Sequence, residues 1–307
     1  MLGIVSKSMG LWYQVETTDG QMHNCRLKGK FKLENKKISN PVAVGDKVEL
    51  LKDQGDANAM IISKILPREN YIIRVSPKKK GHSHIIASNL DQAIIVATVG
   101  TPKTSLGFID RFLVTAEAFR IPATILMNKI DLLDKEELAK LREKMTEYEA
   151  LGYQVRYTSA LIKKDIDGLK EFLSGKTSLF TGHSGVGKST IVNSLAPEAD
   201  QKTSEISEFA NKGVHTTTFA ERFKLDTDTY IIDTPGIKEL GLAEIEKEEL
   251  SHYFPELREL MGQCKFSNCT HTHEPGCAIE SAYEDGRISQ SRYDSYLSML
   301  MGDDNRR

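Results

Sequence analysis

The stretch GHSGVGKS at residues 182–189 decides the fold of this chain. It matches the pattern GxxxxGK[ST] and lies between a strand-like stretch, KTSLFT (176–181), and a helix-like one, STIVNSLA (189–196). The glycines let successive backbone N–H groups turn toward a phosphate, and the helix start adds partial positive charge. The sequence therefore predicts a nucleoside triphosphate site in an α/β domain. The residues expected to contact the nucleotide here are Gly182, His183, Ser184, Gly185, Val186, Gly187, Lys188, Ser189 and Thr190.

Several residues of the phosphate site have expected roles. Lys188 would reach the β and γ phosphates and assist catalysis, and Ser189 would ligate Mg²⁺. Asp233 ends the apolar run TYIID and begins the motif DTPG (233–236). It would hold Mg²⁺ through water, while the N–H of Gly236 would contact the γ-phosphate. A simple turn is the alternative interpretation of DTPG.

A second pair of motifs points to guanine. Asn128, Lys129 and Asp131 belong to NKID (128–131), which follows the strand-like stretch PATILM. An Asp carboxylate at this place accepts from the ring N1–H and the exocyclic amine of guanine, which adenine does not offer together. Ser159 and Ala160 belong to TSA (158–160), whose backbone N–H would contact the guanine O6. Together these motifs favour GTP and GDP over ATP.

The order of the motifs is unusual, because NKID and TSA precede the phosphate loop. Ordinary GTPases have the phosphate loop first, so this G domain is predicted to be circularly permuted. Ligands bind where the carboxyl ends of parallel strands meet, so both halves can still reach one crevice. The permutation places the C-terminal segment directly after DTPG, the expected switch II region.

The stretch NKGVHTTT (211–218) is the expected switch I. Thr217 is our first candidate, and Thr216 the second, for the residue that ligates Mg²⁺ and senses the γ-phosphate; a polar loop before a strand is the alternative. Ile237 follows DTPG where many GTPases have a Gln that orients water. His215 is the nearest polar candidate for that catalytic task, unless it is a loop histidine with another contact. We therefore expect slow hydrolysis until a partner assists.

The N-terminal segment is expected to be a five-stranded β-barrel of the OB-fold class, with a hairpin at Asp19-Gly20 and an exposed basic loop at 76–84. Residues 1–80 carry 15 Lys and Arg against 8 Asp and Glu, whereas the whole chain has a net charge of -2. A basic segment suggests contact with a polyanion such as RNA, and a solvated lysine-rich surface is the alternative. Strands that alternate with helices after residue 90 predict a doubly wound α/β sheet.

Three cysteines lie close together near the C-terminus. Cys264, Cys269 and Cys277 share a 14-residue stretch with His271 and His273. Three thiolates and one imidazole fit a closed tetrahedral structural zinc site, and spacing alone leaves His273 as an alternative to His271. Unligated thiols are the other alternative. We expect a mostly helical zinc domain; its 13 acidic and 7 basic residues from 244 to 307 argue against broad RNA contact. Cys25 stands alone and is expected to be a buried apolar residue.

No apolar run approaches the roughly 20 residues needed to cross a bilayer, and the N-terminus lacks the features of a secretion signal. We therefore expect a cytoplasmic protein that does not bind a membrane. We also expect it to be a monomer. The expected domains are 1–72 (OB-fold, RNA-binding), 73–242 (permuted G domain) and 243–307 (zinc-binding helical domain).

These features together resemble one bacterial family, the ribosome small-subunit-dependent GTPase A family. The resemblance rests on the order NKID, TSA, GHSGVGKS, HTTT and DTPG, on the β-rich N-terminus and on CKFSNCTHTHEPGC (264–277). It implies an OB-fold that contacts 16S rRNA and slow hydrolysis that the 30S subunit stimulates. It also implies a helical zinc domain that docks on the subunit, and a role in late 30S maturation with help in releasing ribosome-binding factor A.

By position, the zinc ligands that the resemblance implies are Cys264, Cys269, His271 and Cys277, and the switch I histidine is His215. His183 departs from the pattern, since an uncharged polar residue such as Gln is expected after Gly182. The competing interpretation is a non-ribosomal, GTP-dependent switch that binds proteins through its barrel and zinc domain. The basic N-terminal segment favours the ribosomal interpretation.

Overall fold

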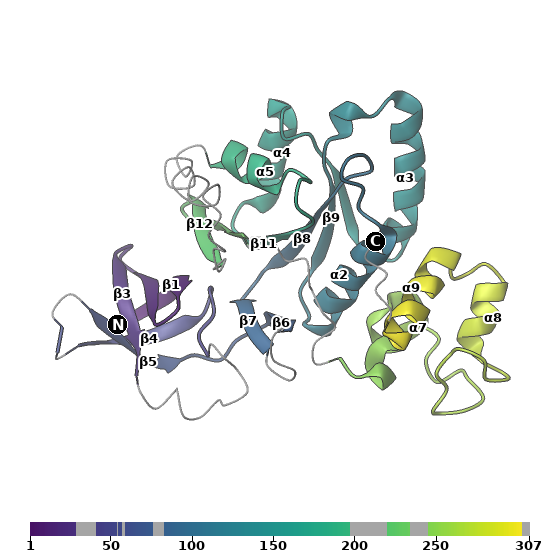
Figure 1. The fold of residues 1–307 in the computed structure, drawn as a ribbon, viewed down its shortest axis with the longest axis horizontal. Helices are drawn as coiled ribbons and strands as arrows, with labels where there is room; N and C mark the ends of the chain where they lie inside the picture. The colour runs from purple at the N-terminus through teal and green to yellow at the C-terminus, as the bar shows by residue number, and fades with distance from the viewer. Residues whose placement is uncertain are drawn as a thin grey trace, which may run out of the picture.

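The computed structural model describes residues 1–28, 41–53, 55–56, 59–75, 83–196, 220–233 and 245–302. The N-terminal barrel (purple in Figure 1) and the C-terminal helices (yellow) lie at opposite ends of the central α/β domain. Within these residues, none of the helices combines the length and apolarity that a membrane crossing requires.

The N-terminal strands form the predicted barrel. β1 pairs with β2, β2 with β3, β3 with β5 and β5 with β4, and β4 pairs again with β1 to close the barrel. The barrel core contains Val5, Val15 and Cys25, so Cys25 is the buried apolar residue that was expected. Gly20 has the positive φ of +79° that a tight turn between β2 and β3 requires. The strands are β1 (Leu2–Met9), β2 (Trp12–Thr17), β3 (Met22–Leu27), β4 (Lys47–Lys52) and β5 (Met60–Ile65).

A hairpin of β6 (Tyr71–Val75) and β7 (Ser83–Ser88) follows the barrel. It corrects the expectation of an exposed loop over 76–84, because Ser83 and His84 belong to β7; residues 76–82 lie outside the described part of the chain. The reason is the alternating stretch HIIAS, whose Ile85 and Ala87 are buried while the exposed His84 lies at the strand's outer side. The adjacent lysines hid this strand pattern. β6 also spans the expected domain boundary after residue 72.

The central sheet has the strand order β10-β9-β8-β11-β13-β12. The first five strands are parallel, and β12 is antiparallel to β13. β9, β11 and β13 correspond to the stretches PATILM, KTSLFT and TYIID that the sequence predicts as strands. Their bounds are β8 (Gln92–Ala97), β9 (Ala123–Met127), β10 (Gln154–Tyr157), β11 (Thr177–Thr181), β12 (Glu221–Asp226) and β13 (Thr229–Asp233).

Helices cover both faces of this sheet (Figure 1), as a doubly wound fold requires. The alternation along β8 shows both cores. Ile95 packs with side chains of α2 and α3, whereas Ile94 and Val96 pack with those of α4 and α5. The helices are α2 (Leu106–Ala118), α3 (Lys135–Ala150), α4 (Lys163–Leu173) and α5 (Lys188–Leu195), with a short 3-10 helix, η1 (Ile130–Leu132), after β9.

The barrel and the central domain share one sheet. β1 pairs with β12 in antiparallel fashion, with Lys7 opposite Glu221, so eleven strands are hydrogen-bonded in one continuous order. The C-terminal segment is mostly helical, as predicted, and its core around Phe254 and Tyr296 also includes Val114 of α2. Its elements are η3 (Lys247–Tyr253), α7 (Pro255–Arg258), α8 (Ala278–Glu284) and α9 (Gln290–Met301).

Candidate functional site

The motifs that precede and follow the phosphate loop in sequence meet at one edge of the sheet. NKID follows β9, TSA follows β10, the phosphate loop follows β11, and Asp233 ends β13. These strands are parallel, so their carboxyl ends lie together. Asp233 is paired in register with Phe180, two residues before Gly182. The crevice predicted for a permuted G domain is therefore assembled.

Asn128 joins three of the motifs. Its Nδ2 donates to the carbonyl oxygen of Val186 in the phosphate loop at 2.8 Å, and its Oδ1 accepts from the N–H of Ala160 at 3.2 Å. The side chain is buried, which makes the loss of either hydrogen bond costly. The amide thus fixes the guanine half of the site against the phosphate half.

Two glycines of the loop are required by close backbone approach. Gly187 has a φ of +95°, and a Cβ there would lie 2.4 Å from Nδ2 of Asn128. Gly182 has a φ of +141°, and a Cβ there would lie 2.3 Å from the carbonyl oxygen of Val96 on β8. A side chain at either position would push the loop away from its neighbours.

Lys188 lies inside the phosphate loop. Its Nζ donates to the carbonyl oxygens of Gly182 at 2.6 Å and His183 at 2.8 Å. Burial lowers the pKa of this ammonium group, while the nearby charge of Asp233 acts in the opposite direction. A desolvated cation that donates to neutral carbonyls gains by exchanging one of them for an anionic phosphate oxygen.

Of the two NKID side chains Lys129 and Asp131, which are predicted to lie at the guanine, one makes a hydrogen bond to a described residue and the other makes none. Lys129 adopts a left-handed backbone conformation, with φ +62°, and its Nζ donates to the carbonyl oxygen of Thr101 at 3.0 Å. Asp131 lies in η1, is exposed, and accepts no hydrogen bond from the described residues. Its carboxylate is therefore available to a base.

The TSA turn is held by its own hydrogen bonds. The N–H of Ser159 donates to Asp165 at 2.8 Å, and the hydroxyl of Ser159 accepts from the N–H of Leu161 at 3.2 Å. The N–H of Ala160 points to Asn128, as described above. The turn therefore presents its backbone toward NKID, the side on which a guanine would lie.

His183 was expected among the residues that contact the nucleotide. Its imidazole stacks on Phe108 of α2, with ring centroids 3.8 Å apart and an interplanar angle of 28°, and its contact with the nucleotide stays a prediction. Its backbone carbonyl still belongs to the loop, where it accepts from Lys188. The side chain thus anchors the loop to α2.

Several predicted residues lie outside the described part of the chain, namely His215, Thr216, Thr217 and Gly236. Of the predicted magnesium ligands, Ser189 is exposed in the first turn of α5 and Asp233 lies at the end of β13. A hydroxyl and a carboxylate are the hard oxygen donors that Mg²⁺ prefers. Thr190 is exposed beside Ser189.

A second cluster lies in the C-terminal domain. The donor atoms of Cys264, Cys269, His271 and Cys277 all lie within 4.8 Å of one another. Nδ1 of His271 is 3.6 Å from Sγ of Cys264 and 3.6 Å from Sγ of Cys277. A tetrahedral ion with zinc–sulfur bonds of about 2.3 Å and a zinc–nitrogen bond of about 2.0 Å requires sulfur–nitrogen separations of about 3.5 Å. The cluster can therefore hold a metal ion.

The surroundings of the cluster suit metal binding. Burial lowers the pKa of His271, which keeps its imidazole neutral, the form that ligates metals. The hydroxyl of Tyr293 donates to the carbonyl oxygen of His271 at 2.8 Å, and that of Tyr296 donates to Thr270 at 2.9 Å. Both tyrosines belong to α9, so the cluster is tied to that helix. His273 is exposed, and its Nδ1 contacts the hydroxyl of Thr272 rather than the cluster.

A buried charge network between the central and C-terminal domains has no counterpart in the sequence motifs. Arg292 of α9 is 1% exposed and pairs with Asp110 of α2 at 2.7 Å and with Glu256 of α7 at 2.6 Å. Asp110 also accepts from Ser295 and Tyr148. Burial raises the pKa of Asp110, and the charge of Arg292 and these hydrogen bonds oppose that rise.

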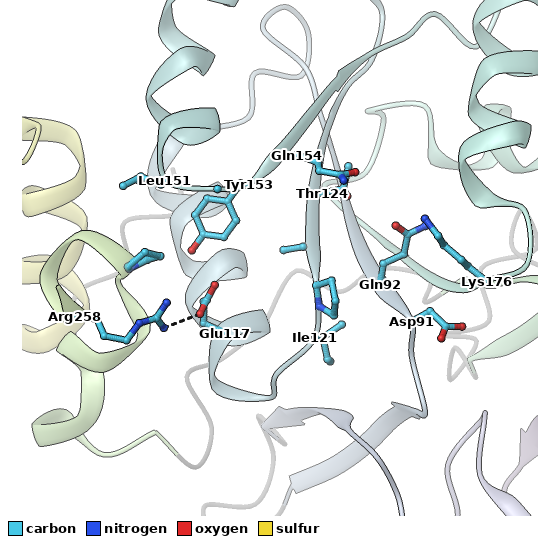
Figure 2. Close-up of a pocket in the computed structure, with 14 residues that line it drawn as sticks. Asp91, Gln92, Glu117, Ile121, Thr124, Leu151, Tyr153, Gln154, Lys176 and Arg258 are labelled. Carbon is cyan, nitrogen blue, oxygen red and sulfur yellow. Dashed lines mark hydrogen bonds and ion pairs between the residues drawn. The ribbon is translucent and has the colours of Figure 1, made fainter.

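Asp110 and Arg292 are 182 positions apart and lie in helices that resemble ordinary amphipathic ones, so no local pattern connects them. Figure 2 shows a second, more exposed ion pair between the same domains, from Arg258 of α7 to Glu117 of α2 at 2.9 Å. It lies beside Tyr153 at the amino edge of the sheet. Two ion pairs, one buried and one exposed, therefore join the two domains.

Comparison with known families assigns the N-terminal and central parts of the chain. The sequence model described as the RsgA GTPase matches residues 65–243, and that described as the RsgA N-terminal domain matches residues 2–61. The chain is similar to the small ribosomal subunit biogenesis GTPase RsgA of Bacteroides fragilis, with 51% identity over 98% of this chain and 96% of the relative. The protein of the same name from Cytophaga hutchinsonii is 49% identical over the full length of both chains.

Solved structures show the same similarity over the whole chain. The crystal structure of YjeQ from Thermotoga maritima superposes with a TM-score of 0.76 and 38% identity, covering 100% of this chain and 99% of that one. The structure of YloQ, described as a circularly permuted GTPase, superposes with a TM-score of 0.73 and 29% identity, covering 100% and 96%.

Proposed function

Because this chain belongs to the RsgA GTPase family, it is a GTP hydrolase, and we propose that it assists late maturation of the small (30S) ribosomal subunit. The observation that carries the proposal is the assembled crevice, in which Asn128 joins NKID, TSA and the phosphate loop despite their permuted order. Relatives about half identical to this chain are named for small-subunit biogenesis.

In the proposed mechanism, the residues of the crevice bind and orient GTP. Asp131 reads the base, and the backbone of the phosphate loop together with Lys188 holds the β and γ phosphates. Ser189, Asp233 and Thr217 would hold Mg²⁺, which when bound would neutralise charge on the phosphate oxygens. Gly236 would contact the γ-phosphate through its N–H. The bond cleaved is the β–γ anhydride, by attack of a water molecule in line with the leaving oxygen.

We further propose that hydrolysis is slow until the 30S subunit assists it. Ile237 stands where a water-orienting Gln occurs in many GTPases, and an aliphatic side chain cannot position water. His215, in the predicted switch I, would take over that task once the subunit fixes its position. General-base or water-positioning groups contribute roughly 10²- to 10⁴-fold to rates.

The remaining parts of the proposal concern partners and ligands. The basic barrel would contact 16S rRNA, since 15 basic against 8 acidic residues in 1–80 suit a phosphate backbone. The Cys264, Cys269, His271 and Cys277 cluster would hold one structural Zn²⁺, because three thiolates and an imidazole are its preferred closed set. We propose domains 1–72, 73–242 and 243–307, a monomer with a cytoplasmic address, and help in releasing ribosome-binding factor A.

The decisive experiment measures GTP turnover of the full chain with and without purified 30S subunits at low salt. Stimulation of roughly 10²-fold is expected from completion of the catalytic site. The proposal would be wrong if the subunits left turnover unchanged, and the chain would then be a non-ribosomal GTP-dependent switch. Large subunits at the same concentration are the control.

The role of His215 has its own test. His215→Ala should lower 30S-stimulated turnover by roughly 10²-fold while GTP affinity stays normal, because only water positioning is lost. His252→Ala changes a histidine of the C-terminal domain and serves as the matched control. Unchanged stimulated turnover in His215→Ala would contradict a role of His215 in positioning the water.

A further inference from the structure

A groove distinct from the nucleotide crevice lies on the face of the sheet that α2 and α3 cover. It has a volume of about 610 Å³ and is bounded by α2, α3 and the loop of residues 98–105. We propose that this α2–α3 groove is a docking site for a protein segment that presents an apolar side chain flanked by carboxylates. The residues that carry the argument are Val99, Lys103, Lys140 and Leu141; Lys144 also lines the groove but pairs with Glu147 at 3.2 Å.

The floor of the groove is apolar. Ile109, Met127, Leu141 and Met145 line it, and all four belong to the core cluster between the sheet and these helices. Val99 stands in the wall and is 39% exposed, although it lies two residues after the buried strand β8. An apolar recess open to solvent gains free energy when an apolar group replaces its water, at about 25 cal/mol per Å². The floor therefore suits an aliphatic side chain.

The rim of the groove is positively charged. Lys103 is exposed and makes no ion pair with any described residue. Lys140 pairs with Glu136, but both side chains are more than two-thirds exposed, so this pair is weak and exchangeable. Among the described residues that line the groove, Glu137 is the one carboxylate, and it already accepts from the backbone N–H of Asp134 in the capping box of α3. Carboxylates on the incoming segment would complement this rim.

The composition of the lining favours protein over RNA. None of the described residues that line the groove is aromatic, so these residues offer unpaired bases no ring on which to stack. A phosphate backbone would neutralise the lysines but would leave the apolar floor in contact with water. A small apolar molecule would cover the floor but would bring no negative charge to the lysines. An acidic segment with an aliphatic anchor satisfies both.

Occupation of the groove has a route to the nucleotide site through the 98–105 loop. The carbonyl oxygen of Thr101 accepts from Nζ of Lys129, the lysine of NKID, at 3.0 Å. A Cβ placed on Gly185 of the phosphate loop would lie 3.3 Å from Cδ of Pro102. The same loop supplies Val99 and Lys103 to the groove. A segment that packs on these two side chains therefore also restrains the partners of Lys129 and Gly185.

The test uses the full chain loaded with GDP and two synthetic 14-residue helical peptides that share their leucines. One carries Glu at every other exposed position, and the other carries Lys there. Fluorescence anisotropy should show the acidic peptide binding roughly tenfold more tightly than the basic one at low salt, with the difference shrinking as salt rises. The acidic peptide should also slow release of a fluorescent GDP analogue.

Charge-reversal variants locate the binding. Lys103→Glu with Lys140→Glu should weaken the acidic peptide roughly tenfold, since two favourable contacts become unfavourable. Lys164→Glu with Lys170→Glu is the matched control, because these exposed lysines lie on α4, across the sheet. Val99→Asp should weaken the same peptide without any change in rim lysines.

Three results would overturn the proposal. They are equal binding of the two peptides, equal weakening by the control pair, and displacement of the acidic peptide by a short single-stranded RNA. None of these measurements uses ribosomal subunits, so failure here leaves the proposed function standing. Conversely, a chain that fails 30S stimulation can still be tested for the groove.

Discussion

At the scale of single residues, the two halves of the nucleotide site are held together by Asn128 and Gly187. The amide of Asn128 approaches the loop so closely that only a residue without a Cβ fits opposite it. Its hydrogen bond to Val186 fixes the register between NKID and the phosphate loop. The motifs predicted to recognise the base and to bind the phosphates are thus joined by one buried side chain.

Gly187→Ala should therefore damage nucleotide binding more than it damages the fold. The new methyl group would meet Nδ2 of Asn128 at 2.4 Å, and φ of +95° adds strain of roughly 1–2 kcal/mol. We expect GDP affinity to fall at least roughly tenfold, which corresponds to about 1.4 kcal/mol. Isothermal titration with GDP measures this loss.

The matched control for this prediction is Gly10→Ala. Gly10 also has a positive φ, of +76°, but nothing lies within 4 Å of where its Cβ would be. It should therefore lose roughly 1 kcal/mol of stability from strain and keep wild-type GDP affinity. Similar loss of GDP binding in both variants would show that strain, and not the contact with Asn128, limits the site.

Residue identities in the crevice could be read from the sequence because each motif carries its own chemistry at fixed spacing. The contacts between motifs could not. His183 illustrates the limit, since its place in GHSGVGKS indicates nucleotide contact while its ring stacks on Phe108. The direction of a side chain depends on the helix packed beside the loop, and that helix lies some 75 residues earlier in the chain.

At the scale of elements, α2 is the shared support of two parts of the molecule. Phe108 packs on the phosphate loop, and Asp110, two residues later, pairs with Arg292 of α9. The helix begins with Ser105 as its N-cap, whose side chain accepts from the N–H of Phe108. The C-terminal domain is therefore anchored to the helix that also contacts the loop.

Arg292→Met tests the buried anchor. It would leave the carboxylates of Asp110 and Glu256 buried without their cation, and breaking such a pair costs about 3–5 kcal/mol. Arg258→Met removes the exposed pair with Glu117 between the same domains and should cost at most about 1 kcal/mol. Urea denaturation of both variants measures the difference. Equal, small losses would contradict a stabilising role for the buried network.

The deficit of Arg292→Met should also depend on pH. Burial raises the pKa of Asp110, and Arg292 is the largest opposing influence, so removal of the guanidinium raises this pKa further. A carboxyl with a raised pKa in the folded state stabilises the fold when protonated, and that contribution is lost as pH rises through the folded value. The deficit relative to wild type should therefore grow from pH 5 to pH 8.

Thiol counting tests the metal cluster. Burial raises the pKa of Cys25 to about 12, so this thiol of the barrel should not react with Ellman's reagent at pH 8 in the native state. With zinc bound, none of the four cysteines should react. A strong chelator should make three reactive and leave Cys25 protected, and denaturant should expose all four. Three reactive thiols before the chelator is added would contradict a bound metal.

Most helices and strands could be predicted because their apolar periodicity matches their burial. β8 illustrates this, since its continuous apolar run is buried on both faces. The β6–β7 hairpin was missed because three lysines beside it suggested a loop. The adjacent lysines indicated an exposed loop, whereas the short alternating stretch of β7 forms a strand because it pairs with β6 in the folded chain.

At the scale of the whole molecule, permutation gives each flanking domain a defined attachment. The barrel extends the central sheet through β12, the strand that follows the predicted switch I, and the C-terminal domain rests on α2. The sequence order alone predicted three domains and a permuted G domain. It could not predict that the barrel shares a sheet with β12, because strand pairing between distant segments leaves no local pattern.

Glu16→Ala should loosen the barrel from the central domain. The carboxylate of Glu16 pairs with Arg222 of β12 at 2.9 Å, and this guanidinium lies over the ring of Tyr230 with a side chain only 5% exposed. Loss of the ion pair between Glu16 and Arg222 should lower the free energy of unfolding by roughly 1–3 kcal/mol. It should also raise amide hydrogen exchange at Lys7 and Glu221, the residues paired between β1 and β12. Because β12 follows the predicted switch I, 30S-stimulated turnover should fall while GDP affinity stays unchanged.

Glu49→Ala is the control, because it removes a mostly exposed pair within the barrel and should change neither the hydrogen exchange nor the stimulated turnover. Unaltered exchange at Lys7 and Glu221 in Glu16→Ala would show that the ion pair of Glu16 with Arg222 does not hold the barrel to the G domain.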